Sequence, residues 1–227
     1  MAPIGGVRSA IVSGRGVAIP DTVVDDFEWG GPVDDRYTAI SGSISNWDIT
    51  TNSPVREGDH SLKFNGGSPS QRITSDENDG LDYYPEVGDK IWTWVYLEHS
   101  DASPRIGFFV PDGGEDREGA STEINARDGS FEIGIEEQQT DSTSVSFSTD
   151  KWYLWEIDTA DNDGDLEFRS TLYDGDTTDD SVLASLTYSG SFGQINERGV
   201  GITEARDRKD YSIDRIVADV GGGDPDI

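Results

Sequence analysis

Three aromatic side chains alternate along the segment KIWTWVYL, residues 90–97, and could bind a sugar ring. In a strand, Trp92, Trp94 and Tyr96 share one face and aliphatic side chains occupy the other. If the aliphatic face packs into the core, the aromatic face is free to stack on sugars. We favour the alternative that the aromatics fill the core, because most large aromatic side chains are buried. Four more aromatics near loop-like sequence could contact a ligand at a rim or cover an edge of the fold: Trp29, Trp47, Tyr83 and Tyr84.

The acidic run DTADNDGD, residues 158–165, is a second group with suitable chemistry. Asp161, Asp163 and Asp165 alternate there, as oxygen ligands do in calcium-binding loops. The EF-hand pattern fails, because the glycine and the last glutamate of that motif are not at their positions. A chain this acidic also produces aspartate clusters by chance. A structural calcium ion is therefore one interpretation of the run, and the sequence indicates no other cofactor.

The composition excludes several partners and chemistries. The 227 residues include 46 Asp and Glu against 17 Lys and Arg, which gives a formal net charge of -29. Nucleic acid and anionic membrane surfaces would be repelled by this charge, and no apolar run is long enough to insert into a bilayer. The chain has no cysteine, so disulfides and thiolate sites are excluded. His60 and His99 are isolated, and neither has a serine or second histidine at a useful spacing.

The charge itself is typical of a protein that works in near-saturating salt. Lysine is scarce among the basic residues, and at such salt the Debye length falls to about 3 Å or less, which screens self-repulsion. The 6 Trp, 8 Tyr and 8 Phe supply the core-building side chains that disordered acidic chains lack. We therefore expect a folded protein in a high-salt environment.

Short alternating or apolar runs, separated by Gly, Asp, Asn, Ser and Pro, predict an all-β fold. Phe131, Ile133 and Ile135 alternate with polar residues and should point inward. KWYLWEID and DLEFRSTLYDG should form a hairpin through the turn-rich TADNDGD. Further strands are expected at HSLKF, KIWTWVYL, RIGFFV, SVSFS, SVLASLTY, RGVGITEA and YSIDRIVADV. About ten to twelve strands favour a two-sheet antiparallel jelly-roll sandwich.

Four segments occur in an order that resembles the concanavalin A-like, laminin-G-like jelly-roll superfamily. They are VDDFEWG, VREGDHSLKF, WYLWEIDTADNDGDLEFRSTLYDG and YSIDRIVAD, within residues 23–220. The resemblance implies a two-sheet sandwich with a concave face. Members of the superfamily include lectins, carbohydrate-binding modules, adhesion domains, virion attachment proteins and some glycoside hydrolases, so the resemblance alone does not choose a function.

Some hydrolases of this superfamily use an E-x-D-x-x-E strand whose first and last glutamates act as nucleophile and acid/base. Glu156, Asp158 and Asp161 occupy these three places in WEIDTAD. The last position departs from the pattern, because aspartate is a methylene shorter and retaining hydrolysis needs carboxyl groups about 5 to 5.5 Å apart. We favour the alternative that Glu156 and Asp158 line the solvent face of a strand and that Asp161 starts its hairpin, in which case the protein is not an enzyme.

The sequence divides into an N-terminal segment at 1–22, a jelly-roll domain at 23–220 and a flexible tail at 221–227. The first segment carries no acid before Asp21, and it is either an assembly element that adds a strand or plug to a neighbouring subunit or a disordered leader. Its candidate assembly residues are Ile4, Val7, Arg8, Ile11, Arg15, Val17 and Ile19.

These observations lead to one principal hypothesis and two alternatives. The principal hypothesis is a non-enzymatic attachment subunit, such as a tail fibre, spike or turret protein, of a tailed virus of halophilic archaea. It would bind a cell-surface glycan or glycoprotein, join other virion subunits through its N-terminus, form a homo-oligomer such as a trimer, and be outside the cell after lysis. The alternatives are a carbohydrate-binding module or glycoside hydrolase using Glu156, and a purely architectural virion subunit.

Overall fold

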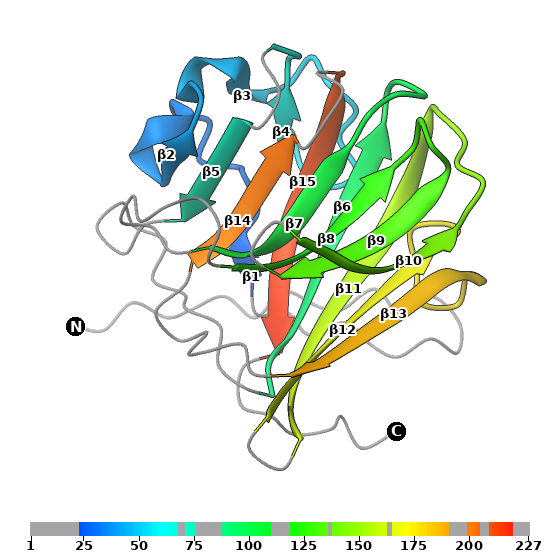
Figure 1. The fold of residues 1–227 in the computed structure, drawn as a ribbon. Helices are drawn as coiled ribbons and strands as arrows, with labels where there is room; N and C mark the ends of the chain where they lie inside the picture. The colour runs from blue at the N-terminus through cyan, green and yellow to red at the C-terminus, as the bar shows by residue number, and fades with distance from the viewer. Residues whose placement is uncertain are drawn as a thin grey trace.

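The computed structural model describes residues 23–67, 71–75, 88–109, 119–135, 138–162, 165–190, 199–204 and 209–219. Two antiparallel sheets pack face to face, which confirms the expected jelly-roll sandwich (Figure 1). Two short 3-10 turns, η1 (Val33–Asp35) and η2 (Ile44–Asn46), interrupt the strands near the start of the domain. None of the helical segments in the described ranges is long and apolar enough to cross a membrane.

The first sheet, called sheet A here, contains the central hairpin. Its strands follow the order β13 (Val182–Gly190), β12 (Asp165–Tyr173), β11 (Lys151–Asn162), β6 (Lys90–Leu97), β15 (Tyr211–Asp219), β4 (Ser61–Phe64) and β3 (Trp47–Thr50), and β1 (Val23–Asp25) also pairs with β15. The hairpin of β11 and β12 is confirmed, and its register runs without a shift from the Leu154–Tyr173 pair to the Asn162–Asp165 pair.

The second sheet, sheet B, lies against sheet A across the core (Figure 1). Its order is β10 (Gln138–Ser144), β9 (Ser130–Ile135), β8 (Gly119–Asn125), β7 (Pro104–Phe109), β14 (Gly199–Glu204), β5 (Gln71–Ser75) and β2 (Tyr37–Ser41). The prediction of a strand at SVSFS is wrong, because β10 ends at Ser144 and residues 145–148 form no ladder. The polar strands β5, β8 and β10 were not predicted, since few of their residues are apolar.

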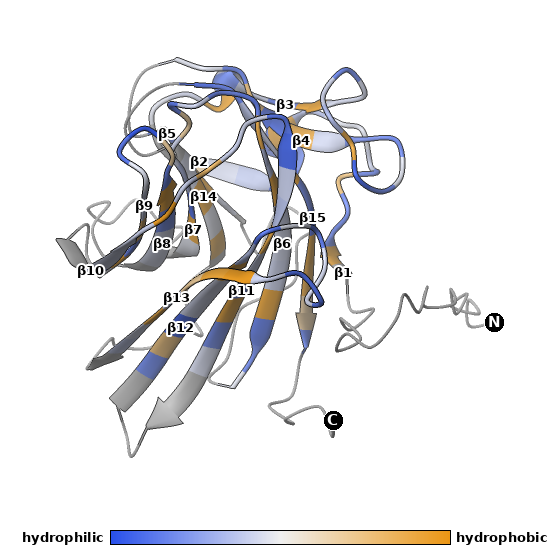
Figure 2. Ribbon diagram, turned by 90° about the vertical axis from the view of Figure 1, so that its right-hand side faces the viewer, coloured by the Kyte–Doolittle hydropathy of each residue, from blue (hydrophilic) through white to orange (hydrophobic). Residues whose placement is uncertain are grey.

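The core lies between the sheets and is rich in aromatic side chains. Phe131 of β9 packs on Trp155 of β11 with 5.7 Å between ring centroids, and Ile133 is also buried, as the alternation of that segment predicted. A polar link crosses the same core: the Trp155 Nε1 donates to the Ser170 Oγ at 2.8 Å, and the Ser170 and Thr122 hydroxyls lie 3.0 Å apart. The alternation is visible as orange and blue bands along β11 and β12 in Figure 2. Each sheet therefore has one face in the core and one outer face.

Candidate functional site

The aromatic residues of β6 lie on the outer face of sheet A. The interpretation that they fill the main core is wrong, because Ile91, Val95 and Leu97 occupy that position. Trp92 and Trp94 instead form a second apolar cluster with Leu154 of β11 and Val217 of β15. Both tryptophans are only 3% exposed, so their rings do not form the open stacking surface that the other interpretation required.

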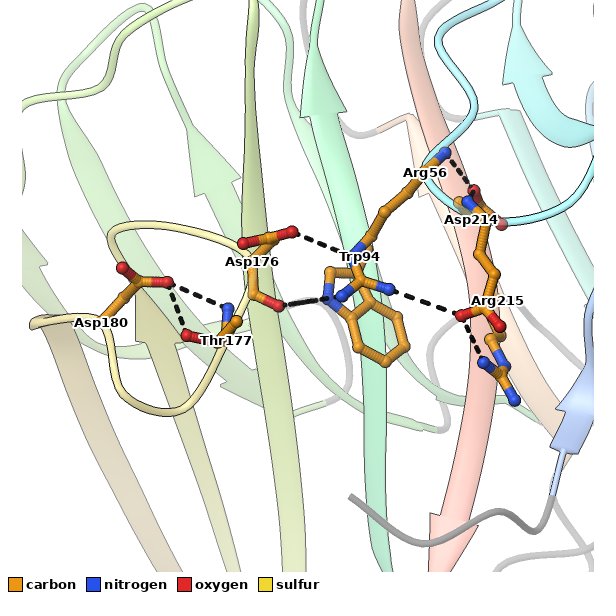
Figure 3. A network of polar contacts seen from close by, with 8 residues as sticks. Arg56, Trp94, Asp176, Thr177, Asp180, Asp214 and Arg215 are labelled. Carbon is orange, nitrogen blue, oxygen red and sulfur yellow. Dashed lines mark hydrogen bonds and ion pairs between the residues drawn. The ribbon is translucent and has the colours of Figure 1, made fainter. Parts of the chain in front are cut away.

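The chain itself covers Trp94. The Arg56 guanidinium, from the loop between β3 and β4, lies 4.3 Å from the Trp94 ring centroid, a cation–π contact (Figure 3). The Trp94 Nε1 donates to the Asp176 carbonyl oxygen at 2.8 Å, and Arg56 Nε is 3.4 Å from the Asp176 carboxylate. Two loops are thus joined over this tryptophan, and both its ring and its N–H are occupied.

Asp214 anchors the same loop from β15. It is 1% exposed, and one of its carboxylate oxygens accepts the backbone N–H groups of Arg56 at 2.5 Å and Glu57 at 2.9 Å. Burial raises the pKa of Asp214 to about 6, although the two N–H donors and the Arg56 charge oppose this rise. Arg215 bonds Glu57 at 2.5 Å and completes the contact between loop and strand (Figure 3). We call Arg56, Trp94, Asp176 and Asp214 the Arg56 clasp.

The carboxylates of WEIDTAD do not assemble as the hydrolase pattern requires. Glu156 Oε2 accepts hydrogen bonds from the Trp92 Nε1 and the Tyr173 hydroxyl, each at 3.1 Å, and burial together with this carboxylate raises the pKa of Tyr173. Asp158 lies 3.9 Å from the Lys90 ammonium and 3.6 Å from the Arg169 guanidinium. The expected turn at Asp161 is wrong, since β11 continues in regular register through Asn162. Because successive residues alternate between the two faces of a strand, positions 156 and 158 share one face and position 161 belongs to the other.

The other predicted ligand contacts are dispersed. Tyr96 is half-buried against Trp152, with ring centroids 5.2 Å apart, on the outer face of sheet A. Trp29 donates to Asp25 at 3.2 Å and lies under the Arg36 guanidinium at 4.9 Å. Trp47 is 2% exposed in the main core, so it does not reach a surface ligand.

Several expectations fall outside the described residues. These are Tyr83, Tyr84, Asp163 and the whole N-terminal assembly segment with Ile4, Val7, Arg8, Ile11, Arg15, Val17 and Ile19. Only the backbone is described at Asp161 and Asp165. Within the described side chains, no group of three or more His, Asp or Glu could hold a metal ion. Calcium at residues 161–165 thus stays a prediction from sequence.

The outer face of sheet B carries a row of polar and charged residues that sequence reasoning missed. Direct cross-strand partners run from Arg72 to Thr203, Arg105, Glu123 and Glu132, across β5, β14, β7, β8 and β9. Arg72 is 3% exposed, Glu123 is 2% exposed and Glu132 is 6% exposed. We call these five residues the polar row.

Hydrogen bonds from neighbouring side chains hold the acidic end of the polar row. Arg105 donates to the Glu123 carboxylate at 2.5 Å. Glu132 Oε1 accepts from the Ser130 hydroxyl at 2.6 Å and from the Asn125 side-chain amide at 3.3 Å. Glu123 and Glu132 occupy directly opposed positions on neighbouring strands, so the face places two carboxylates side by side.

A second row next to the polar row consists of small residues. Thr74, Gly201, Gly107, Ser121 and Gly134 are cross-strand partners in sequence across the same five strands. No side chain in this row is larger than threonine, so none of its residues extends a long side chain over the backbone of the five strands. We call it the small-residue row.

The polar row is difficult to explain by stability alone. Buried ion pairs are often no more stabilising than well-packed apolar residues of similar volume, because desolvation offsets their attraction. Charges that are nevertheless buried on an outer face, outside the core, break the usual pattern, as residues at functional sites do. The signal was present in the sequence: the short turn at 126–129 joins STEIN to SFEIG and sets Glu123 opposite Glu132.

The comparisons agree with this fold and do not identify a family. No protein-family model and no curated protein matches the chain. Among solved structures, carbohydrate-binding module CBM66 from Bacillus subtilis is 11% identical, with a TM-score of 0.54 over 81% of this chain and 94% of that one. The catalytic domain of a glycoside hydrolase family 131 protein from Coprinopsis cinerea is 11% identical, with a TM-score of 0.52 over 88% and 95%.

A glycoside hydrolase family protein from Mycobacterium thermorestibile is similar to the same degree. It is 12% identical, with a TM-score of 0.50 over 86% of this chain and 98% of that one. Identities this low carry information about the fold alone. The chain thus has the two-sheet, concanavalin A-like jelly-roll fold that its sequence resembles.

Proposed function

We propose that this protein is a glycan-binding domain and that it binds through the outer face of sheet B. The polar row carries the proposal. Its guanidinium, carboxylate and hydroxyl groups are the donors and acceptors that sugar hydroxyls need, and its cross-strand spacing repeats at about 5 Å. The adjacent small-residue row has no side chain larger than threonine beside these groups. The similarity in fold to a carbohydrate-binding module supports this choice of ligand.

The outer face of sheet A is the weaker choice for the binding face. The N–H groups of Trp92 and Trp94 are bonded within the chain, and the Arg56 guanidinium occupies the ring of Trp94. A sugar would have to displace these contacts before it could stack, which would offset the free energy of binding. The contacts on this face therefore favour a structural role.

The wider biological role that we propose is host attachment by a virus particle, without turnover of the glycan. The net charge of -29 and the low lysine content support a high-salt environment. The Arg105 ion pair and the three-residue network around Glu132 support recognition, since they pre-organise the binding groups before a ligand arrives.

A glycan array in multimolar salt tests the binding face with matched glutamate variants. Glu123→Gln removes one charge from sheet B, and Glu156→Gln removes the same charge from the outer face of sheet A. We expect Glu123→Gln to weaken binding roughly tenfold or more, because a charged hydrogen bond contributes about 1.5–3 kcal/mol, and Glu156→Gln to bind as the parent does. The reverse result would place the site on sheet A, and no binding to any glycan by the parent would refute the proposal.

Hydrolysis of a glycosidic bond is a second candidate, and one observation favours it. Glu123 and Glu132 are directly opposed, largely buried carboxylates, and two such groups are what acid–base cleavage of a glycoside requires. Incubating glycans that bind with the protein and measuring released reducing ends would test this. Turnover that is lost in both Glu123→Gln and Glu132→Gln would establish the hydrolase, whereas binding without products would leave a lectin-like domain.

A further inference from the structure

Strand β13 lies at the end of sheet A and presents one free edge. It pairs with β12 on one side, and none of the strands within the described ranges pairs with it on the other (Figure 1). It is 9 residues long, which makes it the longest edge strand of the two sheets. An edge of this kind offers unpaired N–H and C=O groups to another strand.

The composition of this edge is unusual for the chain. Between Val182 and Gly190 there is no charged residue and no proline, although 28% of the whole chain is charged. Val182 is 54% exposed, and Ser185 and Thr187 are exposed as well. Natural sheets protect their edges with charges, prolines, bulges or short strands. Strand β13 has no charge and no proline, and its one register shift lies at its beginning, where Val182 pairs with Tyr173 and Ala184 with Leu172, so the run from Ala184 to Gly190 is regular.

The other edges of the sandwich are protected. Strand β3 is 4 residues long and contains Asp48. Strand β10 contains Asp141 and has an irregular register between Gln139 and Asp141. Strand β2 is 5 residues long and its register shifts between Ala39 and Ser41. Pairing with another chain is thus prevented at these three edges and permitted at β13.

We propose that β13 pairs antiparallel with β13 of a second copy of this chain and so joins two A sheets into one. Two copies that each carry a net charge of -29 repel each other, and strand pairing brings their backbones to about 4.8 Å. An edge without carboxylates is required for this approach, and β13 is the longest edge strand in the described ranges that meets this condition. The pairing is self-complementary and uses the free edge of both copies, so it stops at two.

This inference is independent of the proposed glycan site, which lies on the outer face of the other sheet. The polar row occupies β5, β14, β7, β8 and β9, whereas β13 belongs to sheet A. Pairing at β13 would place two glycan-binding faces on one dimer without covering either row. Two linked sites bind a multivalent surface more tightly than one site does.

Sedimentation equilibrium on the full chain tests the dimer with one edge variant and one control. Ser185→Lys combined with Thr187→Lys places like charges opposite each other across the proposed interface. Thr171→Lys adds a lysine on the same face one strand further in, directly opposite Ser185 on β12. Each added lysine makes the net charge less negative. Repulsion between two whole copies should therefore weaken in both the edge variant and the Thr171→Lys control, which by itself would strengthen association.

We expect a dimer for the parent at multimolar salt and weaker dimerisation as salt is lowered. The Kd of the edge variant should rise roughly tenfold, because like charges opposed across strands repel, whereas Thr171→Lys should dimerise as the parent does. Amide exchange in β13 should also slow as protein concentration rises. A monomeric parent, an edge variant that dimerises normally, or assemblies larger than two would each overturn the proposal. Circular dichroism would verify that both variants fold.

Discussion

Replacing Asp214 by asparagine should change how the stability of the protein depends on pH. Asp214 is 1% exposed, and burial raises its pKa from 3.8 to about 6. Because the pKa in the folded state is the higher one, folding favours the protonated carboxyl. The stabilisation from Asp214 is therefore complete at pH values below about 3.8 and is lost as the pH rises through about 6. Asparagine keeps an oxygen for the N–H groups of Arg56 and Glu57 but does not titrate.

The size of the effect follows from the two pKa values. At about 1.4 kcal/mol per pH unit, the interval from 3.8 to about 6 corresponds to roughly 3 kcal/mol in the free energy of unfolding. Between pH 7.5 and pH 4.5 roughly 2 kcal/mol of this should appear, since the unfolded chain is still mostly ionised at pH 4.5.

Urea unfolding of the parent and of Asp214→Asn at both pH values, in the same salt, measures this difference. The other 45 acidic residues are common to the two proteins, so their titration cancels when the stabilities are subtracted. Asp179→Asn, at an exposed position in the loop after β12, controls for the loss of one charge. We expect the parent to gain roughly 2 kcal/mol on Asp214→Asn as the pH falls. A difference that does not change with pH would refute the reasoning.

Three other predictions concern stability. Asp25→Ala should lower the free energy of unfolding by roughly 3 kcal/mol in chemical denaturation, because it leaves the Phe27 N–H, the Tyr37 hydroxyl and the Arg36 guanidinium without their buried carboxylate. Ser170→Ala should lower it by roughly 1–3 kcal/mol, since the buried Trp155 Nε1 loses its acceptor; near-UV circular dichroism would verify that the core stays packed. The Tm should fall when salt is lowered from multimolar to about 0.1 M, and an unchanged calorimetric Tm would contradict the interpretation of the net charge.

The sequence predicted the strands whose alternation is complete. KIWTWVYL and the β11–β12 hairpin were placed correctly, because each has an apolar set at every second residue and a turn-rich connection. SVSFS was placed wrongly, since alternation over so short a segment does not require a partner strand. The strands β5, β8 and β10 were missed because their outer residues are polar, which makes their apolar period incomplete.

The candidate site was harder to predict than the fold. Sequence alternation correctly grouped Trp92, Trp94 and Tyr96 on one face, but it could not show that Arg56, from a loop over 30 residues earlier in the chain, would cover one of them. The polar row comes from five strands, so no single segment contains it. Only the pairing of Glu123 with Glu132 could be predicted from one segment, because a single hairpin contains both residues.

The two outer faces show how similar carboxylates come to different roles in one sandwich. Glu156 lies in the segment that looks like a hydrolase motif, yet its bonds go to Trp92 and Tyr173, which tie it into the apolar cluster under the Arg56 clasp. Glu123 has no such motif, yet it is buried beside a second glutamate and an arginine, outside the main core. Arg105 bonds the Glu123 carboxylate, and the Ser130 hydroxyl and the Asn125 amide bond that of Glu132, so both carboxylates are held in place on the sheet. Carboxylates held in this way can accept hydrogen bonds from the hydroxyl groups of a sugar with little reorganisation, and this is why we propose the site at the segment with the weaker sequence signal.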